Sequence, residues 1–112
     1  MTHDDFRRIA LALNEAYESS HMRHPDFRVG KRIFATLYAD LQSGMVKLTP
    51  EQQARFVADF PATFEPESGA WGRTGCTRVR LESVDEETLG EALTLAWQNI
   101  AKESEPKPPR IP

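Results

Sequence analysis

Cys76 is the side chain of this 112-residue sequence with the most distinctive chemistry, because a cysteine thiolate is a strong nucleophile. Arg78 and Arg80 follow it at two-residue steps, so the three share one face of an expected strand, and nearby cations favour the thiolate. However, no histidine lies close to Cys76 in the sequence to act as a base. A lone cysteine is more often a small buried apolar residue, and we favour that interpretation over a catalytic one.

A second group of residues with possible chemistry is His21, His24 and Asp26, whose side chains could ligate a metal ion. The spacing of the two histidines at a strand end lacks the further ligands or the helical spacing of known zinc sites. Turn formation and hydrogen bonding explain these residues more simply. We therefore expect no bound metal, no catalytic residues and a non-enzymatic protein.

Trp71 and Arg73 stand among three glycines just before an expected strand, in the segment 69–75. Glycine allows left-handed backbone and close chain approach, so we expect a tight loop here. Phosphate-binding glycine loops open onto a helix rather than a strand, so we expect no nucleotide cofactor. Tryptophan and arginine are enriched at protein contact centres, which makes Trp71 and Arg73 candidates for docking a protein or peptide. The alternative, which we favour for Trp71, is that its ring closes the edge of the core.

Basic and apolar residues alternate along the expected strands. The apolar set that should face the helices is Phe27, Val29, Val46, Leu48, Val79 and Leu81. Because neighbouring side chains of a strand point to opposite faces, the basic set on the other face is Arg28, Lys47, Arg78 and Arg80. Residues 20–48 and 70–81 hold eight of the 14 Lys and Arg but two of the 17 Asp and Glu, so positive charge should gather on the strands and hairpin turns.

We predict that this basic face, with Arg73 beside it, binds nucleic acid and in particular DNA. The four strand cations would contact phosphates, and Trp71 could stack on an exposed base. One alternative is a solvated sheet face whose cations pair with Glu65, Glu67, Glu82 or helical acids. Another is a protein- or peptide-docking module centred on the Trp71 loop, with no role for nucleic acid.

The elements that must position these residues follow from the spacing of apolar side chains and from turn signals. Three helices are expected over about 4–16, from Pro50 to near Pro61, and after a cap at Asp85. Thr49 and Gln52 have the spacing of a capping box for the second helix. Two or three antiparallel strands joined by hairpins are expected between 27 and 48, a short edge strand near Phe64, and a strand over 76–84.

Four motifs in this order carry a resemblance to a known family. They are the run 24–29 (His-Pro-Asp-Phe-Arg-Val), the segment 31–35, the stretch 46–53 and the segment 69–73 (Gly-Ala-Trp-Gly-Arg). Together they resemble the MmcQ/YjbR-like family of small bacterial proteins over roughly 6–101. The resemblance implies an α+β fold in which an antiparallel sheet packs against helices, with a secretion-chaperone-like, double-wing shape. It also implies DNA binding suggested from that winged shape, and no established enzymatic activity.

Length and composition describe one domain, which we place at 1–101, with a disordered proline-rich tail at 102–112. Apolar content of 39% and charged content of 28% are ordinary for a globular protein, and no apolar run is long enough to span a membrane. A lone cysteine and an acidic start without a signal sequence predict a cytoplasmic protein. We expect a monomer, and the net charge of −3 argues against unselective binding of polyanions.

Overall fold

The computed structural model describes residues 1–40 and 42–104 and shows the predicted α+β fold. The helices are α1 (His3–Leu11), α2 (Pro50–Asp59), α3 (Gly69–Arg73) and α4 (Glu86–Ser104). The strands are β1 (Tyr17–His21), β2 (His24–Val29), β3 (Arg32–Leu37), β4 (Ser43–Lys47), β5 (Phe64–Pro66) and β6 (Cys76–Arg80). They form one antiparallel sheet in the order β1-β2-β3-β4-β6-β5.

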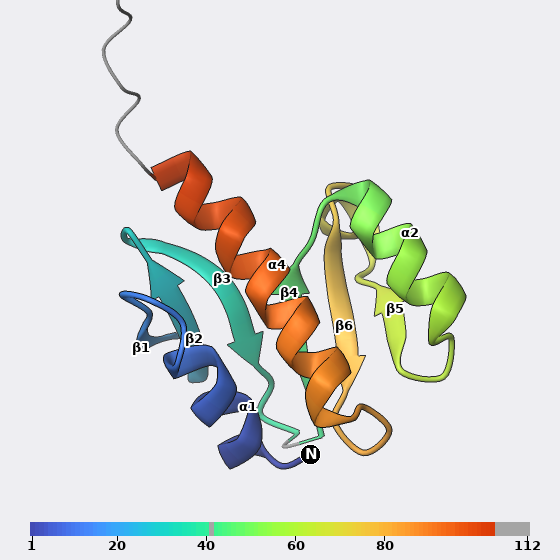
Figure 1. Ribbon diagram of the computed structural model, residues 1–112, viewed down its shortest axis with the longest axis horizontal. Helices are drawn as coiled ribbons and strands as arrows, with labels where there is room; N and C mark the ends of the chain where they lie inside the picture. The colour runs from blue at the N-terminus through green and yellow to red at the C-terminus, as the bar shows by residue number, and fades with distance from the viewer. Residues whose placement is uncertain (41, 105–112) are drawn as a thin grey trace, which may run out of the picture.

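Helices α1 and α4 lie over one face of the sheet, and α2 lies beside β5 (Figure 1). The six apolar strand residues predicted to face the helices are all buried in the core, which confirms the alternation. They pack against the apolar stripe of α4, whose buried members are Leu89, Ala92, Leu93, Ala96 and Ile100. The other side of the sheet, called the open face below, carries the alternate side chains.

The predicted caps of the last two long helices are confirmed. The Thr49 hydroxyl accepts from the Gln52 backbone N–H at 3.1 Å, and the Gln52 side chain accepts from the Thr49 N–H at 2.9 Å. Asp85 accepts from the Thr88 N–H at 2.7 Å ahead of α4. These contacts satisfy backbone donors that a helix leaves unpaired at its start, so the sequence signals fix where α2 and α4 begin.

The N-terminal region differs from the prediction in the length of its helix. α1 ends at Leu11 rather than near residue 16, and the chain then turns through Glu15, whose φ is 61°. The Asn14 carbonyl in this turn accepts a hydrogen bond from the Trp97 indole at 2.9 Å. The strand β1 follows, which the sequence did not predict. Its residues are polar, and pairing with β2 holds them in the extended conformation.

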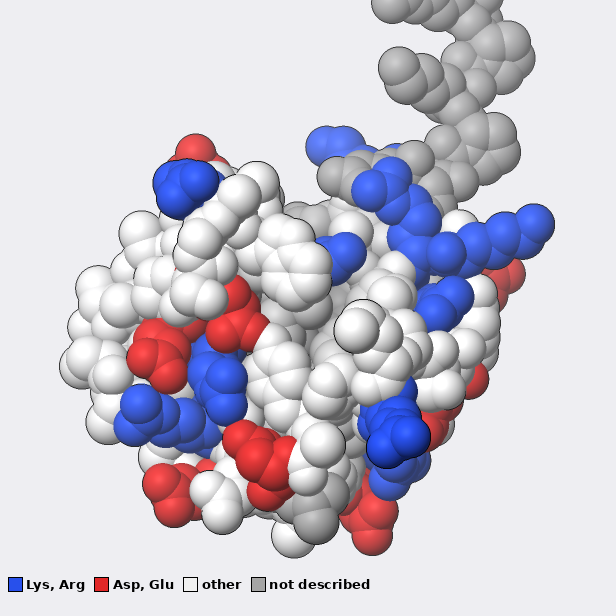
Figure 2. Space-filling view, turned by 180° about the vertical axis from the view of Figure 1, so that it is seen from behind, with Lys and Arg blue, Asp and Glu red and all other residues white. Residues whose placement is uncertain are grey.

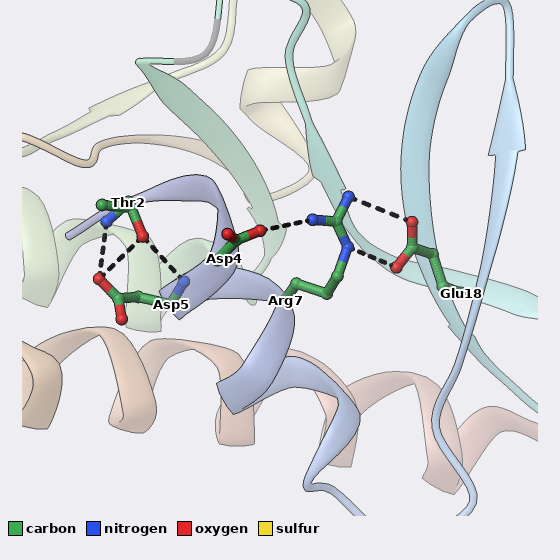
Figure 3. A network of polar contacts seen from close by, with 5 residues as sticks. All are labelled: Thr2, Asp4, Asp5, Arg7 and Glu18. Atoms are coloured by element: carbon green, nitrogen blue, oxygen red, sulfur yellow. Dashed lines mark hydrogen bonds and ion pairs between the residues drawn. The ribbon is translucent and has the colours of Figure 1, made fainter.

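Arg7 connects α1 to that unpredicted strand (Figure 3). Its guanidinium donates to Glu18 of β1 at 2.7 and 3.3 Å and to Asp4 at 3.1 Å. At the start of the same helix, Thr2 and Asp5 form a capping box. A forked contact of this kind fixes orientation as well as distance, so it holds α1 against the β1 edge of the sheet.

Two further boundaries differ from the prediction. The strand expected over 76–84 ends at Arg80, and a turn leads to Asp85. The last helix continues to Ser104, so the boundary at 101 falls inside α4, while residues 105–112 of the expected tail lie outside the described residues. Within the described part of the chain, no helix is both long and apolar enough to cross a membrane.

The centre of the sheet divides where β3 meets β4. These strands pair only at Ala35–Val46, Thr36–Met45 and Leu37–Gly44. Beyond these pairs the start of β3 and the end of β4 separate, with the C-terminal half of α4 running past the opening (Figure 1). A register shift between Phe27 and Arg28 also bends β2 against β3. The division creates room on the open face.

Candidate functional site

A groove of about 800 Å³ occupies this divided part of the open face and is the candidate site. Its lining is mostly apolar. The strands and the residues that directly follow β3 and β4 contribute His21, His24, Arg32, Ile33, Thr36, Tyr38, Met45, Lys47, Leu48 and Cys76, and the helices and their caps contribute Thr49, Pro50, Trp71, Thr74, Asn99 and Ile100. Seen from the side opposite to Figure 1, the surface is hollowed between two halves (Figure 2). A concavity of this size is typical of ligand and peptide sites.

One wall of the groove is the segment 69–75, which forms the short helix α3 instead of the predicted loop. The glycines have the role the sequence predicts: Gly69 and Gly75 have φ of 69° and 114°. A Cβ on Gly72 would lie 1.7 Å from the Glu67 carbonyl oxygen, so only glycine lets the chain pass there. The Gln53 amide of α2 donates to the Gly72 and Cys76 carbonyls, both at 3.0 Å, and so anchors the middle of the segment and the residue that follows it.

Trp71 is 69% exposed and lines the groove from α3. The prediction that its ring closes the core edge is therefore wrong. The physical reason is local: the tight approach at Gly72 turns the backbone of α3 inward, and the preceding side chain is left outside. An indole held in water on a short helix is available to a partner, which the docking interpretation requires.

Tyr38 faces the same groove and is held from two sides. Its ring lies edge-on to the His24 ring at 5.9 Å, and the Arg78 guanidinium lies 4.8 Å from its centroid. Arg78 is held in turn by an ion pair with Asp40 at 3.1 Å. The tyrosine ring is thus fixed before any ligand binds, which lowers the entropic cost of binding.

His21, Asp26 and Arg28 form a polar cluster where β1 joins β2. The fully buried Asp26 carboxylate accepts from Arg28 at 2.8 and 3.1 Å, and it lies 2.7 Å from the His21 Nδ1. Burial alone would raise the pKa of Asp26, but hydrogen bonds from Arg28 and His21, with their charges, outweigh it and lower the pKa. Asp26 is therefore ionised, and its bond to Nδ1 leaves the His21 Nε2 for other contacts.

The two histidines flank a tight turn, as the simpler interpretation predicts. Met22 and Arg23 between them have φ of 48° and 68°, the pairing found in two-residue hairpin turns. Among the described residues, no group of three His, Cys, Asp or Glu side chains is placed to hold a metal ion. Cys76 is buried at 9% exposure, in keeping with its interpretation as a small apolar residue.

The cations of the open face do not form the continuous basic strip that phosphate binding would favour. Arg28 is paired with Asp26 as described, and Arg80 lies 3.4 Å from Glu65. Arg78 and Arg80 share a second, polar hollow with Asp40, Glu65 and Glu82. Burial raises the pKa of the Glu67 carboxyl, and the charge of Arg78 also acts on this group and partly offsets the rise. Acidic and basic side chains alternate on the left half of this face (Figure 2). The three arginines are paired, as the alternative of a neutralised face predicts, but only Glu65 is among the partners named for it; Asp26 and Asp40 are the other two.

Lys47 and Arg73 differ from the other three candidates. Among the described residues, neither has an ion-pair partner within 4.0 Å. Lys47 lines the groove and is half-buried, while Arg73 is exposed at the end of α3. Of the predicted site residues, the structure therefore brings Lys47 and Trp71 together in one cavity and leaves Arg73 beside it.

Sequence reasoning missed several groove residues, among them Tyr38, Met45 and Asn99. Asn99 joins α4 to the end of β4 and the start of α2, because its amide donates to the Lys47 carbonyl at 3.0 Å and to the Gln52 side chain at 2.9 Å. It lies in a helix of otherwise apolar periodicity, and nothing local marks it. Met45 could have been found, since it alternates with Val46 and so belongs to the open face, as Lys47 does.

Comparison with known proteins agrees with this fold. A family model described as YjbR matches residues 11–99. The crystal structure of Deinococcus radiodurans protein DR2400, with its DUF419 domain, is similar at a TM-score of 0.80 and 23% identity, covering 95% of this chain and 83% of that one. None of the curated proteins matches the chain. At that level of identity the likeness supports the fold alone, and function must be argued from the groove.

Proposed function

This chain belongs to the YjbR family, and from the groove on its open face we propose that it is a non-enzymatic binding protein that docks an extended segment of a protein partner. The observation that carries the proposal is an exposed Trp71 lining a preformed, mostly apolar groove. Covering such a ring is favourable by about 2 kcal/mol, and aromatic anchors in a pocket dominate the affinity of many interfaces.

The dimensions of the groove favour a segment over a folded surface. Its volume of about 800 Å³ is in the range that encloses a drug-sized ligand or a few side chains. The walls come from α3, from the β1–β2 hairpin and from the end of α4, and Gln53 and Asn99 hold them through backbone contacts. A fixed cavity binds with a smaller ordering cost than a mobile loop would.

Selection from a displayed library of random peptides tests the proposal. We expect peptides that bind the chain, quench or shift Trp71 fluorescence in a Trp97→Phe background, and lose about tenfold or more in affinity with Trp71→Ala. Tyr17→Ala is the matched control, because Tyr17 is 42% exposed on β1 and does not line the groove. Recovery of no peptide that depends on Trp71 would contradict the proposal.

The same Trp97→Phe background tests whether the Trp71 ring is exposed to solvent. We expect Trp71 to emit at the wavelength of a solvated indole and Trp71→Ala to change the free energy of unfolding by less than about 0.5 kcal/mol. A blue-shifted emission together with unfolding of Trp71→Ala would mean that the ring belongs to the core, and the docking role would fail.

Nucleic-acid binding through Arg28, Lys47, Arg73, Arg78 and Arg80 is the second candidate. The observation in its favour is that Lys47 and Arg73, next to the exposed Trp71, have no carboxylate partner among the described residues. Stacking of a base on Trp71 with two phosphate contacts is compatible with that arrangement. The ion pairs at the other three arginines make it the weaker candidate.

A further inference from the structure

We propose that the docked segment is acidic: it places a carboxylate at Lys47 while an aromatic or aliphatic side chain packs against Trp71 and Met45. This inference rests on the proposed docking function and adds the chemistry of the partner. The groove has an apolar part and a cationic part, and each part selects a different feature of the ligand.

The charges of the lining are of one sign. Lys47 and Arg32 line the groove together with His21 and His24, and the described lining residues include no aspartate or glutamate. Lys47 is half-buried, and its main chain is held by the Asn99 amide at 3.0 Å. A ligand carboxylate at Lys47 would form a charge-assisted hydrogen bond, which is shorter and stronger than a neutral one.

The arginines on either side of the groove are paired with carboxylates. Arg78 and Arg80 lie on the next strand of the same face, and Asp40 and Glu65 pair with them. Arg28 at the other side is paired with the buried Asp26. The fold therefore supplies carboxylates to the arginines on either side of the groove, while no described residue supplies one to Lys47.

A second observation points to a missing polar partner at the same place. The Nδ1 of His24 is buried and has no hydrogen-bond partner among the described residues, although His24 lines the groove. An unsatisfied buried nitrogen costs about 1–3 kcal/mol. Because this nitrogen has almost no accessible area, a docked main chain would reach it only if the His24 ring turned.

The carboxylates that flank the groove favour an acidic peptide over a nucleic acid. A strand of nucleic acid carries a phosphate at every step, and where it extended towards β6 it would meet Asp40 and Glu65. A segment with one or two carboxylates can meet Lys47 without crossing that region.

Fluorescence polarisation with three labelled peptides tests the inference. The peptides share one short sequence around a phenylalanine, which is flanked by glutamates, by glutamines or by lysines. We expect the glutamate peptide to bind about tenfold more tightly than the glutamine peptide and the lysine peptide to bind most weakly. Lys47→Ala should remove the preference for glutamate, and Lys47→Arg should keep it. Lys31→Ala, at the exposed β2–β3 turn, is the matched control and should leave it intact.

The possible outcomes distinguish the preference for an acidic segment from the docking function on which it rests. Equal binding of the glutamate and glutamine peptides, with both lost in Trp71→Ala, would overturn the acidic preference and leave docking in place. Binding of none of the three, with no Trp71-dependent peptide from the library, would overturn both. A single-stranded oligonucleotide that binds through Lys47 more tightly than the glutamate peptide would show that the partner is a nucleic acid, and it would overturn the inference.

Discussion

Asp26 shows how much a single buried side chain contributes to the open face. It is 0% exposed, and its partners Arg28 and His21 come from the two strands of the first hairpin. From the sequence, His21 and Asp26 belonged to a possible metal-ligand group and Arg28 to the phosphate contacts, and nothing linked the two sets. Alternation placed Arg28 on the correct face, but alternation says nothing about the partner it finds there.

Asp26→Asn is expected to destabilise the fold by about 3 kcal/mol at neutral pH, because Arg28 and His21 lose a buried counterion. The folded-state pKa of Asp26 lies below its ordinary value of 3.8, so its contribution is present above that value and is lost as the pH falls through the folded pKa. Denaturant unfolding measured from pH 7 downward should therefore show a shallower loss for Asp26→Asn than for the wild type. Asp59→Asn, at an exposed carboxylate, is the control; an identical acid profile for Asp26→Asn would contradict the prediction.

Two glycines give a matched pair of opposite sign. A Cβ at Gly72 would lie 1.7 Å from a backbone oxygen, whereas nothing lies within 4 Å of one at Gly90 in α4. Gly72→Ala should cost more than about 2 kcal/mol, because backbone must move. Gly90→Ala should stabilise by about 0.5–1 kcal/mol through helix propensity. Thermal or denaturant unfolding distinguishes the two, and a tolerated Gly72→Ala would refute the account of α3.

Among the elements, α3 depends on its neighbours more than on its own sequence. It has five residues, two of them glycine, and its N-cap Ser68 makes no side-chain cap bond. A helix this short is not stable alone, so contacts from outside must hold it. The Gln53 amide of α2 provides them by donating to the Gly72 and Cys76 carbonyls and to the Thr77 hydroxyl.

Gln53→Leu should therefore act on the groove through α3. We expect the free energy of unfolding to fall by about 1–2 kcal/mol. We also expect the Trp71 ring to move more freely, which lowers its steady-state fluorescence anisotropy in the Trp97→Phe background. Gln52→Leu removes a different amide on the same helix, one that caps α2, and serves as the comparison. Equal anisotropy in the two variants would argue against Gln53 as the support of α3.

Across the molecule, the charge pattern decides between the two partner classes. Each phosphate contact on duplex DNA releases counterions, which gives a slope of log affinity against log salt of about −0.9 per contact. If all five predicted cations engaged phosphates, the slope would be about −4.5. Because three are held in ion pairs, a mixed DNA pool should bind weakly, with a slope of about −1.8 or shallower. A slope near −4.5 that falls with Arg78→Ala and Arg80→Ala would restore the nucleic-acid interpretation.

Local signals were enough for the fold class, for the starts of α2 and α4 and for the apolar face of the sheet. Caps and apolar periodicity act between residues a few positions apart, so a sequence displays them directly. The YjbR resemblance, confirmed over residues 11–99, rested on short motifs of the same kind. Strand β1 was not predicted, because it is stabilised by pairing with β2 and its own polar residues carry no strand signal.

The groove could not be predicted from the sequence in the same way, because it depends on contacts between distant parts of the chain. The divergence of β3 from β4, the exposure of Trp71 and the pairing of three arginines with Asp26, Asp40 and Glu65 are set by packing and by long-range distances. Alternation assigns a side chain to a face, but whether its charge remains unpaired depends on which carboxylate the fold brings within a few ångströms. Lys47 lines the groove, and no described residue brings a carboxylate within 4.0 Å of it.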